Sequence, residues 1–221
     1  MLFLDYPIRA FMATRQMSLP ILFVDGHAIV DSTRIIEHLE RTHPANPLYP
    51  EDPVLLERAL ALEDYFDEEL GPHIRAVLVN ELFRAGVTPT VEAFGMAQSA
   101  AMKRLMRLAF PVFRIFYKYR HHMSPHDIER GRAKLAEALD RLEAEIGPSG
   151  YLVGERFTVA DLTAASLFFP IAFPPEYPYQ PPQVSLDTLA AFREPMKDRK
   201  AQLWVTEMYR RHRGEDTSLA T

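Results

Sequence analysis

The sequence predicts a small α/β domain followed by an all-helical domain. Short β-rich runs and one helix come before residue 43, and helical patterns fill the chain beyond Pro53. Between them, the stretch HPANPLYPEDP contains four prolines, which disfavour regular structure. We therefore predict an α/β domain at residues 1–42, a linker at 43–52, a helical domain at 53–213 and a disordered tail at 214–221.

Composition and charge exclude several classes of function. The 221 residues are 48% hydrophobic and 25% charged, which is ordinary for a globular protein, and the net charge of -5 gives no reason to expect a nucleic-acid partner. The chain has no cysteine, so it can form no disulfide, no thiolate nucleophile and no cysteine metal site. No signal peptide is recognisable, and no apolar run approaches the ~20 residues that span a bilayer. We expect a cytoplasmic location.

The first elements are a hairpin and a helix. The runs LPILFV and HAIV are rich in β-formers, and Asp25-Gly26 between them is a strong signal for a two-residue hairpin turn. The next helix begins near Asp31 and Ser32, and its apolar side chains recur at helical spacing at Ile35, Ile36 and Leu39.

The remaining segments indicate helices. The stretch PVLLERALALEDYFDEEL is expected to break or kink at Gly71-Pro72 before HIRAVLVNELFR, and one helical stretch is expected from about Thr90 to Arg120. In SPHDIERGRAKLAEALDRLEAEIG, Ser124 is the expected N-cap. Two shorter helices are expected around 186–194 and 200–213.

A capping motif lies within GERFTVADL. The Thr158 side chain can accept a hydrogen bond from the helix amides while Asp161 binds the amide of Thr158, an arrangement that stabilises a helix by about 1 kcal/mol. We interpret the motif as structural, with no catalytic role.

Taken in order, these motifs resemble those of the cytosolic glutathione transferases. The resemblance rests on a leucine-proline before a strand, a hairpin, an acidic residue and a serine at a helix start, a proline-rich linker, a helical domain and the late GERFTVADL. It covers the chain from Ser18 to about Arg213. It implies a thioredoxin-like first domain, glutathione as co-substrate, no metal and a homodimer.

The resemblance also implies the glutathione-binding residues. Leu19 and Pro20 would form a cis-proline turn whose backbone pairs with the cysteinyl part of glutathione, although an ordinary trans proline at a strand start is the alternative. Asp31 and Ser32 would hold the γ-glutamyl end, because a helix N-terminus attracts a carboxylate. The alternative for this pair is a simple helix cap, and Asp31 is shorter than the glutamate or glutamine that is usual in the family.

The first domain is expected to be incomplete. In the family, a strand, a helix and a second strand come before the proline motif, yet only nineteen residues come before Pro20. The family's catalytic hydroxyl therefore cannot be placed, and Tyr6 is better explained as a strand-edge tyrosine. We favour a start codon chosen too late, so that the natural protein is longer, over a chain that lacks the element.

The expected function is conjugation of glutathione to a small hydrophobic electrophile, for detoxification or catabolism. The thiol nucleophile would belong to glutathione, which suits a chain without cysteine. The electrophile is expected between the domains, lined by helices that flank the segment AMKRLMRLAFPVFRIFYKYRHHM. The alternatives are a non-catalytic binding or dimerisation module of the same fold and a truncated form of a longer enzyme.

One segment of the helical part is unusually basic. From Ala93 to His126 there is no acidic residue, while basic residues alternate with aromatic ones at Lys103, Arg104, Arg107, Arg114, Lys118 and Arg120. The segment could attract an anionic substrate, lie on a membrane surface, or be an ordinary amphipathic helix with solvated charges. Pro111 is expected to interrupt it, which would count against a continuous membrane-lying helix.

Overall fold

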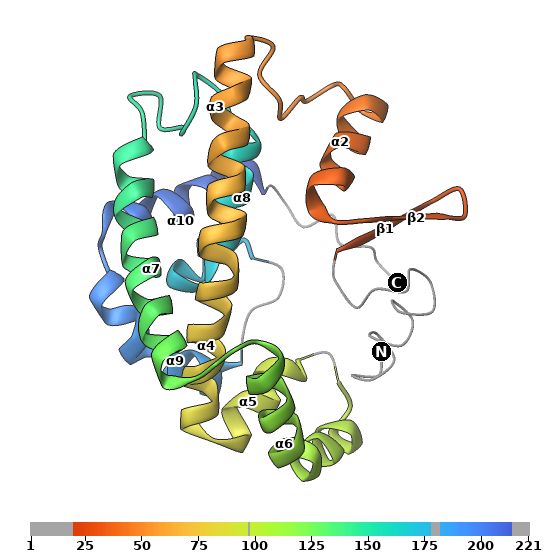
Figure 1. Ribbon diagram of the computed structural model, residues 1–221, viewed down its shortest axis with the longest axis vertical. Coiled ribbons are helices and arrows are strands. Elements are labelled where there is room, and N and C mark those ends of the chain that lie inside the picture. Colours follow the sequence, from red (N-terminus) through yellow and green to blue (C-terminus); the bar gives the residue numbers. More distant parts are fainter. Residues whose placement is uncertain (1–19, 97, 178–181, 214–221) are drawn as a thin grey trace.

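The N-terminal elements form a hairpin and one helix. The computed structural model in Figure 1 describes residues 20–96, 98–177 and 182–213. Strands β1 (Ile21–Val24) and β2 (His27–Val30) pair antiparallel, and helix α2 (Ser32–Thr42) follows them. The turn residues Asp25 and Gly26 both have positive φ, 49° and 79°, as the predicted two-residue hairpin turn requires. Leu19 and Tyr6 lie outside the described residues.

The rest of the described chain is helical, as the sequence predicted. In order, the helices are α3 (Pro53–Asp64), a π-helical turn η1 (Tyr65–Leu70), α4 (Gly71–Ala85), α5 (Val87–Phe94), α6 (Ala100–Arg120), α7 (Pro125–Glu145), α8 (Val159–Ala172), α9 (Gln183–Arg193), a 3₁₀ turn η2 (Glu194–Met196) and α10 (Lys200–His212). The hairpin and α2 lie to one side of these helices (Figure 1). The structure thus has an α/β part and an all-helical part, while the exact domain boundaries stay a prediction.

Three local expectations about the helices are corrected by the structure. The Gly71-Pro72 pair does not break the helix, because the wider turn η1 passes directly into α4, with Pro72 in the first turn of α4, whereas the alternative expectation of a kink stays a prediction. The single stretch predicted from Thr90 to Arg120 is two helices. Helix α5 ends at Phe94, and α6 begins anew after Ser99, whose side chain accepts a hydrogen bond from the Met102 amide at 3.3 Å.

Pro111 does not interrupt α6. The helix is continuous from Ala100 to Arg120 with Pro111 inside it. Proline removes one helical hydrogen bond, but Pro111 is exposed, so water can reach the carbonyl that this leaves without a partner. Met106 and Phe110, which precede Pro111, are the buried residues of α6, and Phe110 packs in the cluster that joins α6 to α4.

The main core lies between α3, α7, α8 and α10. Phe66 of η1 and Phe168 of α8 are fully buried and meet edge to face, with ring centroids 5.8 Å apart. Trp204 of α10 is also buried in this core, and its indole N–H donates to the Gly150 carbonyl at 2.8 Å. A smaller cluster joins α4 to α6, where Phe83 meets the rings of Phe110, Phe113 and Tyr117.

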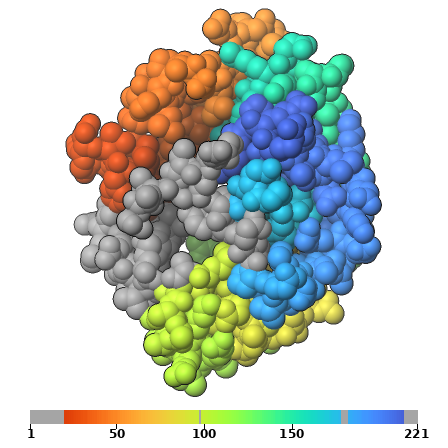
Figure 2. All heavy atoms as spheres, turned by 180° about the vertical axis from the view of Figure 1, so that it is seen from behind, coloured from red at the N-terminus to blue at the C-terminus, as the bar shows by residue number. Residues whose placement is uncertain are grey.

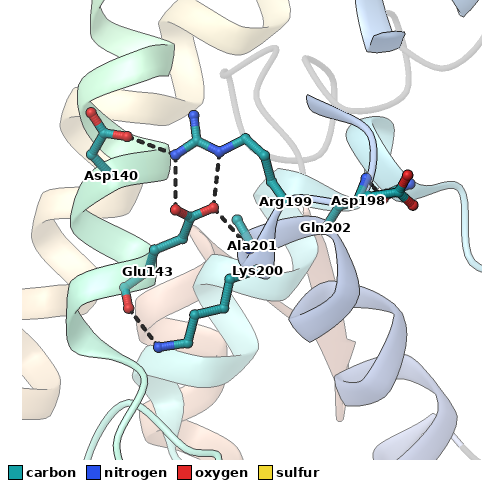
Figure 3. Close-up of polar contacts among 7 residues, drawn as sticks. All are labelled: Asp140, Glu143, Asp198, Arg199, Lys200, Ala201 and Gln202. Atoms are coloured by element: carbon teal, nitrogen blue, oxygen red, sulfur yellow. Dashed lines mark hydrogen bonds and ion pairs between the residues drawn. The ribbon is translucent and has the colours of Figure 1, made fainter. Parts of the chain in front are cut away.

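A charged network ties α10 to α7 (Figure 3). The Arg199 guanidinium binds the Glu143 carboxylate through two contacts of 2.9 Å and the Asp140 carboxylate at 2.6 Å. Glu143 also accepts the Ala201 amide at 3.1 Å, so this one carboxylate caps the start of α10 as well. Its bonds with Arg199 lower the pKa of Glu143.

The segment after α2 is anchored to the helical part. The Glu40 carboxylate at the end of α2 accepts the Leu48 amide at 2.7 Å, and the Leu48 carbonyl in turn accepts the Val159 amide at the start of α8 at 3.0 Å. These bonds connect the end of α2 to the start of α8. They therefore help to hold α2 against the helical part of the chain.

Candidate functional site

The start of α2 is built around a strained aspartate. Asp31 has φ 82° and ψ 133°, a conformation that non-glycine residues rarely adopt and that costs of order 1–3 kcal/mol. Its carboxylate oxygen Oδ1 accepts the amides of Thr33 at 3.1 Å and Arg34 at 3.4 Å. Asp31 is therefore the N-cap of α2, and its own carboxylate already occupies two of the free amides at this helix end.

Ser32 retains the donors that an anion could use. It is the first helical residue and is half-buried, and neither its hydroxyl nor its amide has a hydrogen-bond partner within the described ranges. A carboxylate placed here would meet one N–H, one O–H and the partial positive charge of the helix end. Of the two residues predicted to hold the γ-glutamyl end, Asp31 caps the helix and Ser32 keeps unused donors, and the assignment of both to glutathione stays a prediction.

Glu63 was missed at the sequence level. It is 3% exposed, and its Oε1 accepts the hydroxyl of Thr33 at 2.9 Å, which links α3 to the first turn of α2. Burial raises the pKa of Glu63, and the hydrogen bond from Thr33 opposes this. The helical spacing of α3 could have revealed this burial, because Glu63 lies on the face of α3 that also buries Ala59 and Leu62.

Pro20 is exposed and stands immediately before β1. Leu19, its predicted partner in glutathione binding, lies outside the described residues. Tyr6, which the sequence explains better as a strand-edge tyrosine than as the catalytic hydroxyl, also lies outside them. The structure therefore brings Asp31, Ser32 and Glu63 together around Thr33, whereas the assignment of Leu19 and Pro20 stays a prediction.

Thr158 and Asp161 lie at the start of α8 and are fully buried. One oxygen of Asp161 accepts the amide and the hydroxyl of Thr158 at 2.8 and 2.9 Å, and the other accepts the Leu152 amide at 2.9 Å. Burial raises the pKa of Asp161, and these hydrogen bonds oppose that shift. Each oxygen is bound within the fold, and this geometry fits a structural role.

An apolar pocket of about 340 Å³ lies between α8 and α10. Figure 2 shows the end of α10, in dark blue, beside the cyan segment that includes the end of α8. Burial raises the pKa of Tyr209 in this pocket to about 12. The pocket is lined by Phe157, Leu162, Ala165, Ser166, Tyr177, Met208, Tyr209, His212 and Arg213.

A second apolar pocket, of about 260 Å³, lies between α5 and α6. Its lining includes Phe94, Leu105 and Phe116 and offers almost no polar group. Along the described part of the chain, no group of three or more histidine and acidic side chains is arranged to hold a metal ion, and no helix has the length and apolarity to span a membrane.

Comparison with known proteins shows similarity in sequence over part of the chain and similarity in fold over most of it. Residues 125–194 match the family of the glutathione S-transferase C-terminal domain. A probable maleylacetoacetate isomerase of Caenorhabditis elegans is 49% identical over 43 residues, which is 20% of this chain and 20% of that protein. The maleylacetoacetate isomerase of Dictyostelium discoideum is 50% identical over 44 residues, or 20% of this chain and 19% of that protein. The alignments thus span about one fifth of these curated relatives.

Solved structures extend the similarity over nearly the whole chain. The beta-etherase LigF from Sphingobium sp. strain SYK-6 superposes with a TM-score of 0.57 and 19% identity, over 93% of this chain and 84% of that one. A glutathione S-transferase from Rhodospirillum rubrum gives a TM-score of 0.51 and 18% identity, over 90% of this chain and 74% of that one. At such low identity these matches establish the fold alone.

Proposed function

We propose that this chain is a member of the glutathione S-transferase family, whose C-terminal domain matches residues 125–194, and that it binds glutathione and adds the glutathione sulfur to a small apolar electrophile. The observation that carries the proposal is Ser32, which presents a free hydroxyl and amide at a helix N-terminus among the described residues. In this proposal Ser32 holds the α-carboxylate of the γ-glutamyl group, and Asp31 keeps the first turn of α2 in place.

The nucleophile in this reaction is the glutathione thiolate. A free thiol has a pKa of about 8.5, so a donor that stabilises the thiolate speeds the addition. The chain has no cysteine, so a protein thiolate is not available for the disulfide chemistry of some members of the family. The described residues assign no donor to the thiolate, and we propose none.

The electrophile is placed in the pocket between α8 and α10. Ligand sites combine an apolar lining with a few polar groups that set orientation. This pocket has both, because the protonated phenol of Tyr209 lies among apolar side chains, whereas the pocket between α5 and α6 is almost wholly apolar. We therefore favour the pocket between α8 and α10 as the electrophile site, in place of the helices beside the basic segment that the sequence suggested.

The test combines binding and turnover. The protein is passed over immobilised glutathione, eluted with free glutathione, and assayed with a panel of electrophiles that includes maleylacetoacetate, after the names of the two curated relatives. Retention and turnover are expected. Retention without turnover would leave glutathione binding and remove catalysis by this chain, and absence of retention would overturn the proposal.

A second candidate function rests on the outer face of α6. Leu108, Val112 and Tyr119 are 81%, 73% and 83% exposed on one side of this helix, where Leu105, Ile115 and Phe116 are also exposed. Arg104, Arg114, Lys118 and Arg120 form no ion pair with described residues, unlike Lys103 and Arg107, which bind Glu92. An apolar stripe with basic residues beside it is typical of a helix that lies on an anionic lipid surface.

We infer this lipid role as an alternative that does not need catalysis. A second copy is a poorer occupant of the α6 face, because pairing would bring like charges together. Co-sedimentation with phosphatidylglycerol vesicles at low salt is expected, and phosphatidylcholine vesicles should retain little protein. Leu108→Ser should weaken binding, while Leu203→Ser, at another exposed leucine on α10, should not. Equal recovery with both lipids would reject the role.

A further inference from the structure

A small basic pocket, of about 190 Å³, lies where the end of α6 meets α4. Its lining contains two arginines, two histidines and a tyrosine, and none of the lining residues is acidic. In a chain whose net charge is -5, the pocket is a local concentration of basic side chains. The lining residues are Pro72, Arg75 and Ala76 of α4, and Tyr117, Arg120, His121 and His122 at the end of α6 and in the turn after it.

The two arginines of this pocket are not neutralised by any described carboxylate. Arg75 and Arg120 are exposed, and neither forms an ion pair or a side-chain hydrogen bond with described residues, whereas Arg107 on the same helix α6 binds Glu92. A basic residue at the C-terminal end of a helix is ordinary, because it faces the partial negative charge there, and this accounts for Arg120. Arg75 lies inside the continuous helix that η1 and α4 form, so no helix end accounts for its place beside Arg120.

The charged side chains that act on His121 are all positive. Burial lowers the pKa of His121, and the charges of Arg75, Arg120 and His122 lower it further. The ring of Tyr117 lies against that of His121, with centroids 4.3 Å apart, and the Tyr117 hydroxyl has no hydrogen-bond partner among the described residues. The pocket therefore offers N–H and O–H donors and positive charge, with no negative charge of the described chain to balance them.

We propose that this pocket binds the phosphate group of a small soluble ligand. A guanidinium group matches the oxygens of phosphate or carboxylate through paired, charge-assisted hydrogen bonds. Phosphate is favoured because a phosphate monoester carries a charge of about -1.5 to -2 at neutral pH and three acceptor oxygens. Two arginines and a phenol from two helices suit this group better than a carboxylate, which has one charge and two oxygens.

The position of the pocket favours a soluble phosphate over a lipid headgroup. Tyr117 packs against Phe83 of α4, with ring centroids 5.7 Å apart, so the pocket lies on the side of α6 that faces the other helices. Leu108 and Val112, by contrast, belong to the exposed apolar stripe that would contact a lipid surface. The inference does not depend on glutathione binding, since none of the lining residues belongs to the proposed glutathione site.

Isothermal titration calorimetry with inorganic phosphate at constant ionic strength tests the site. Saturable binding by the wild-type chain is expected, with acetate bound more weakly. Arg75→Gln and Arg120→Gln should each weaken phosphate binding about tenfold or more, because each removes charge-assisted hydrogen bonds. Arg104→Gln is the matched control, since Arg104 is also exposed on α6 without an ion pair to described residues, and its loss removes the same charge outside the pocket. This variant should keep the wild-type affinity.

Two results would overturn the site. Absence of saturable phosphate binding by the wild-type chain at millimolar concentrations is the first, and it needs no variant. An equal loss of affinity in Arg104→Gln is the second, because attraction by net charge alone would then explain the binding. Retention on immobilised glutathione should be the same in all three variants, so the outcome is separate from that of the proposed function.

Vesicles of phosphatidic acid, which display phosphate monoesters on a lipid surface, test the source of the phosphate. Capture of the protein by these vesicles should be the same for Arg75→Gln as for the wild-type chain, because the pocket lies away from the apolar stripe. If Arg75→Gln abolished capture, the ligand would be a lipid headgroup, and the assignment to a soluble phosphate would be overturned.

Discussion

At the scale of single residues, two neighbours at the start of α2 have different roles: Asp31 caps the helix, and Ser32 keeps its donors available for a ligand. Asp31 uses its carboxylate and a strained backbone to cap the helix, which leaves Ser32 with an unused hydroxyl and amide among the described residues. A capping residue and a ligand-binding residue look alike in sequence, because both roles favour small polar side chains at a helix start. The hydrogen bonds of the folded chain separate the two roles.

Ser32→Ala is expected to weaken glutathione binding. The change removes one hydroxyl donor to a carboxylate, which corresponds to about 1.5–3 kcal/mol of binding free energy. Isothermal titration calorimetry measures the loss. Ser124→Ala is the matched control, because Ser124 also begins a helix, α7, but lies in another part of the fold. It should lower thermal stability and leave glutathione affinity unchanged. Unaltered affinity in Ser32→Ala would remove Ser32 from the site.

Glu63→Gln is expected to raise the stability of the unliganded protein at neutral pH. Burial raises the pKa of Glu63 above its ordinary value of 4.5, so folding favours the protonated form. Between 4.5 and the raised pKa the folded chain holds a proton that the unfolded chain has released, so the free energy of unfolding falls as the pH rises through that window. The stability gained by the variant should therefore be full above the raised pKa and should vanish as the pH falls to 4.5.

Thermal unfolding of both proteins across this pH range measures the effect. A gain of about 1 kcal/mol would raise the midpoint by roughly 2–4 °C for a chain of this size. Loss of stability at neutral pH would mean that the charge of Glu63 supports the empty fold.

At the scale of elements, α10 depends on a carboxylate from α7. Its N-cap residue Arg199 makes no capping bond with its own side chain, and Glu143 instead accepts the Ala201 amide and pairs with Arg199 (Figure 3). The start of α10 is thus stabilised from a different helix. This contact could not be predicted from the sequence around Lys200, because Glu143 is 58 residues away from Ala201.

Glu143→Gln is expected to destabilise the fold by about 1–2 kcal/mol at neutral pH, since it weakens charge-assisted bonds at a partly buried site. The pair with Arg199 lowers the pKa of Glu143, so its contribution is present above the ordinary value of 4.5 and is lost as the pH falls through the lowered pKa. The difference between variant and wild type should shrink accordingly in thermal unfolding measured towards acidic pH.

The matched control for this prediction is Glu207→Gln. Glu207 pairs with Arg210 and Arg211 on α10 itself, and these bonds lower the pKa of Glu207 to about 2. The pairs lie at the surface, where solvent screens them, so this variant should change the melting temperature little. A larger loss in Glu207→Gln than in Glu143→Gln would contradict the importance assigned to the contact between helices.

Helix α6 illustrates how packing overrides a local signal. Proline inside a helical pattern usually marks a break. Pro111 is accommodated because it is exposed while Met106 and Phe110 are buried on the opposite side. The continuity of α6 matters for the proposed binding to a lipid surface. Only a continuous helix presents its exposed apolar side chains as one stripe.

At the scale of the whole molecule, α2 is held between its hairpin and the helical part. The Glu40–Leu48–Val159 connection and the Thr33–Glu63 bond attach it at its two ends. The proposed glutathione site is formed where the second of these bonds joins α2 to α3. Any change that separates α2 from the helical part should therefore weaken ligand binding, even where the site residues are intact.

The chain is expected to form a homodimer, as its resemblance to the family implies. Light scattering coupled to size exclusion should give twice the chain mass of 25.3 kDa, and dilution should shift the mass towards one chain. Leu108→Ser should leave this mass unchanged, because the basic residues beside the apolar stripe of α6 would repel a second copy. A mass of one chain at every concentration would reject the dimer.

The sequence by itself determined the local elements. The Asp25-Gly26 turn, the helix after it and the Thr158–Asp161 cap depend on nearby residues, whose backbone preferences act over a few positions. The resemblance to the glutathione transferases followed from the order of these elements along the chain. The sequence also supplied Asp31 and Ser32 as candidates, although it could not tell the cap from the free donor.

Only the tertiary structure decided which distant groups meet. Burial of Glu63 against Thr33, the Glu143 cap on α10 and the continuity of α6 through Pro111 each depend on packing between segments far apart in the chain. A carboxylate on a helix has the same local pattern whether it faces water or the core. Its burial, its pKa and its need for a partner are set by the elements packed around it, which no local signal contains.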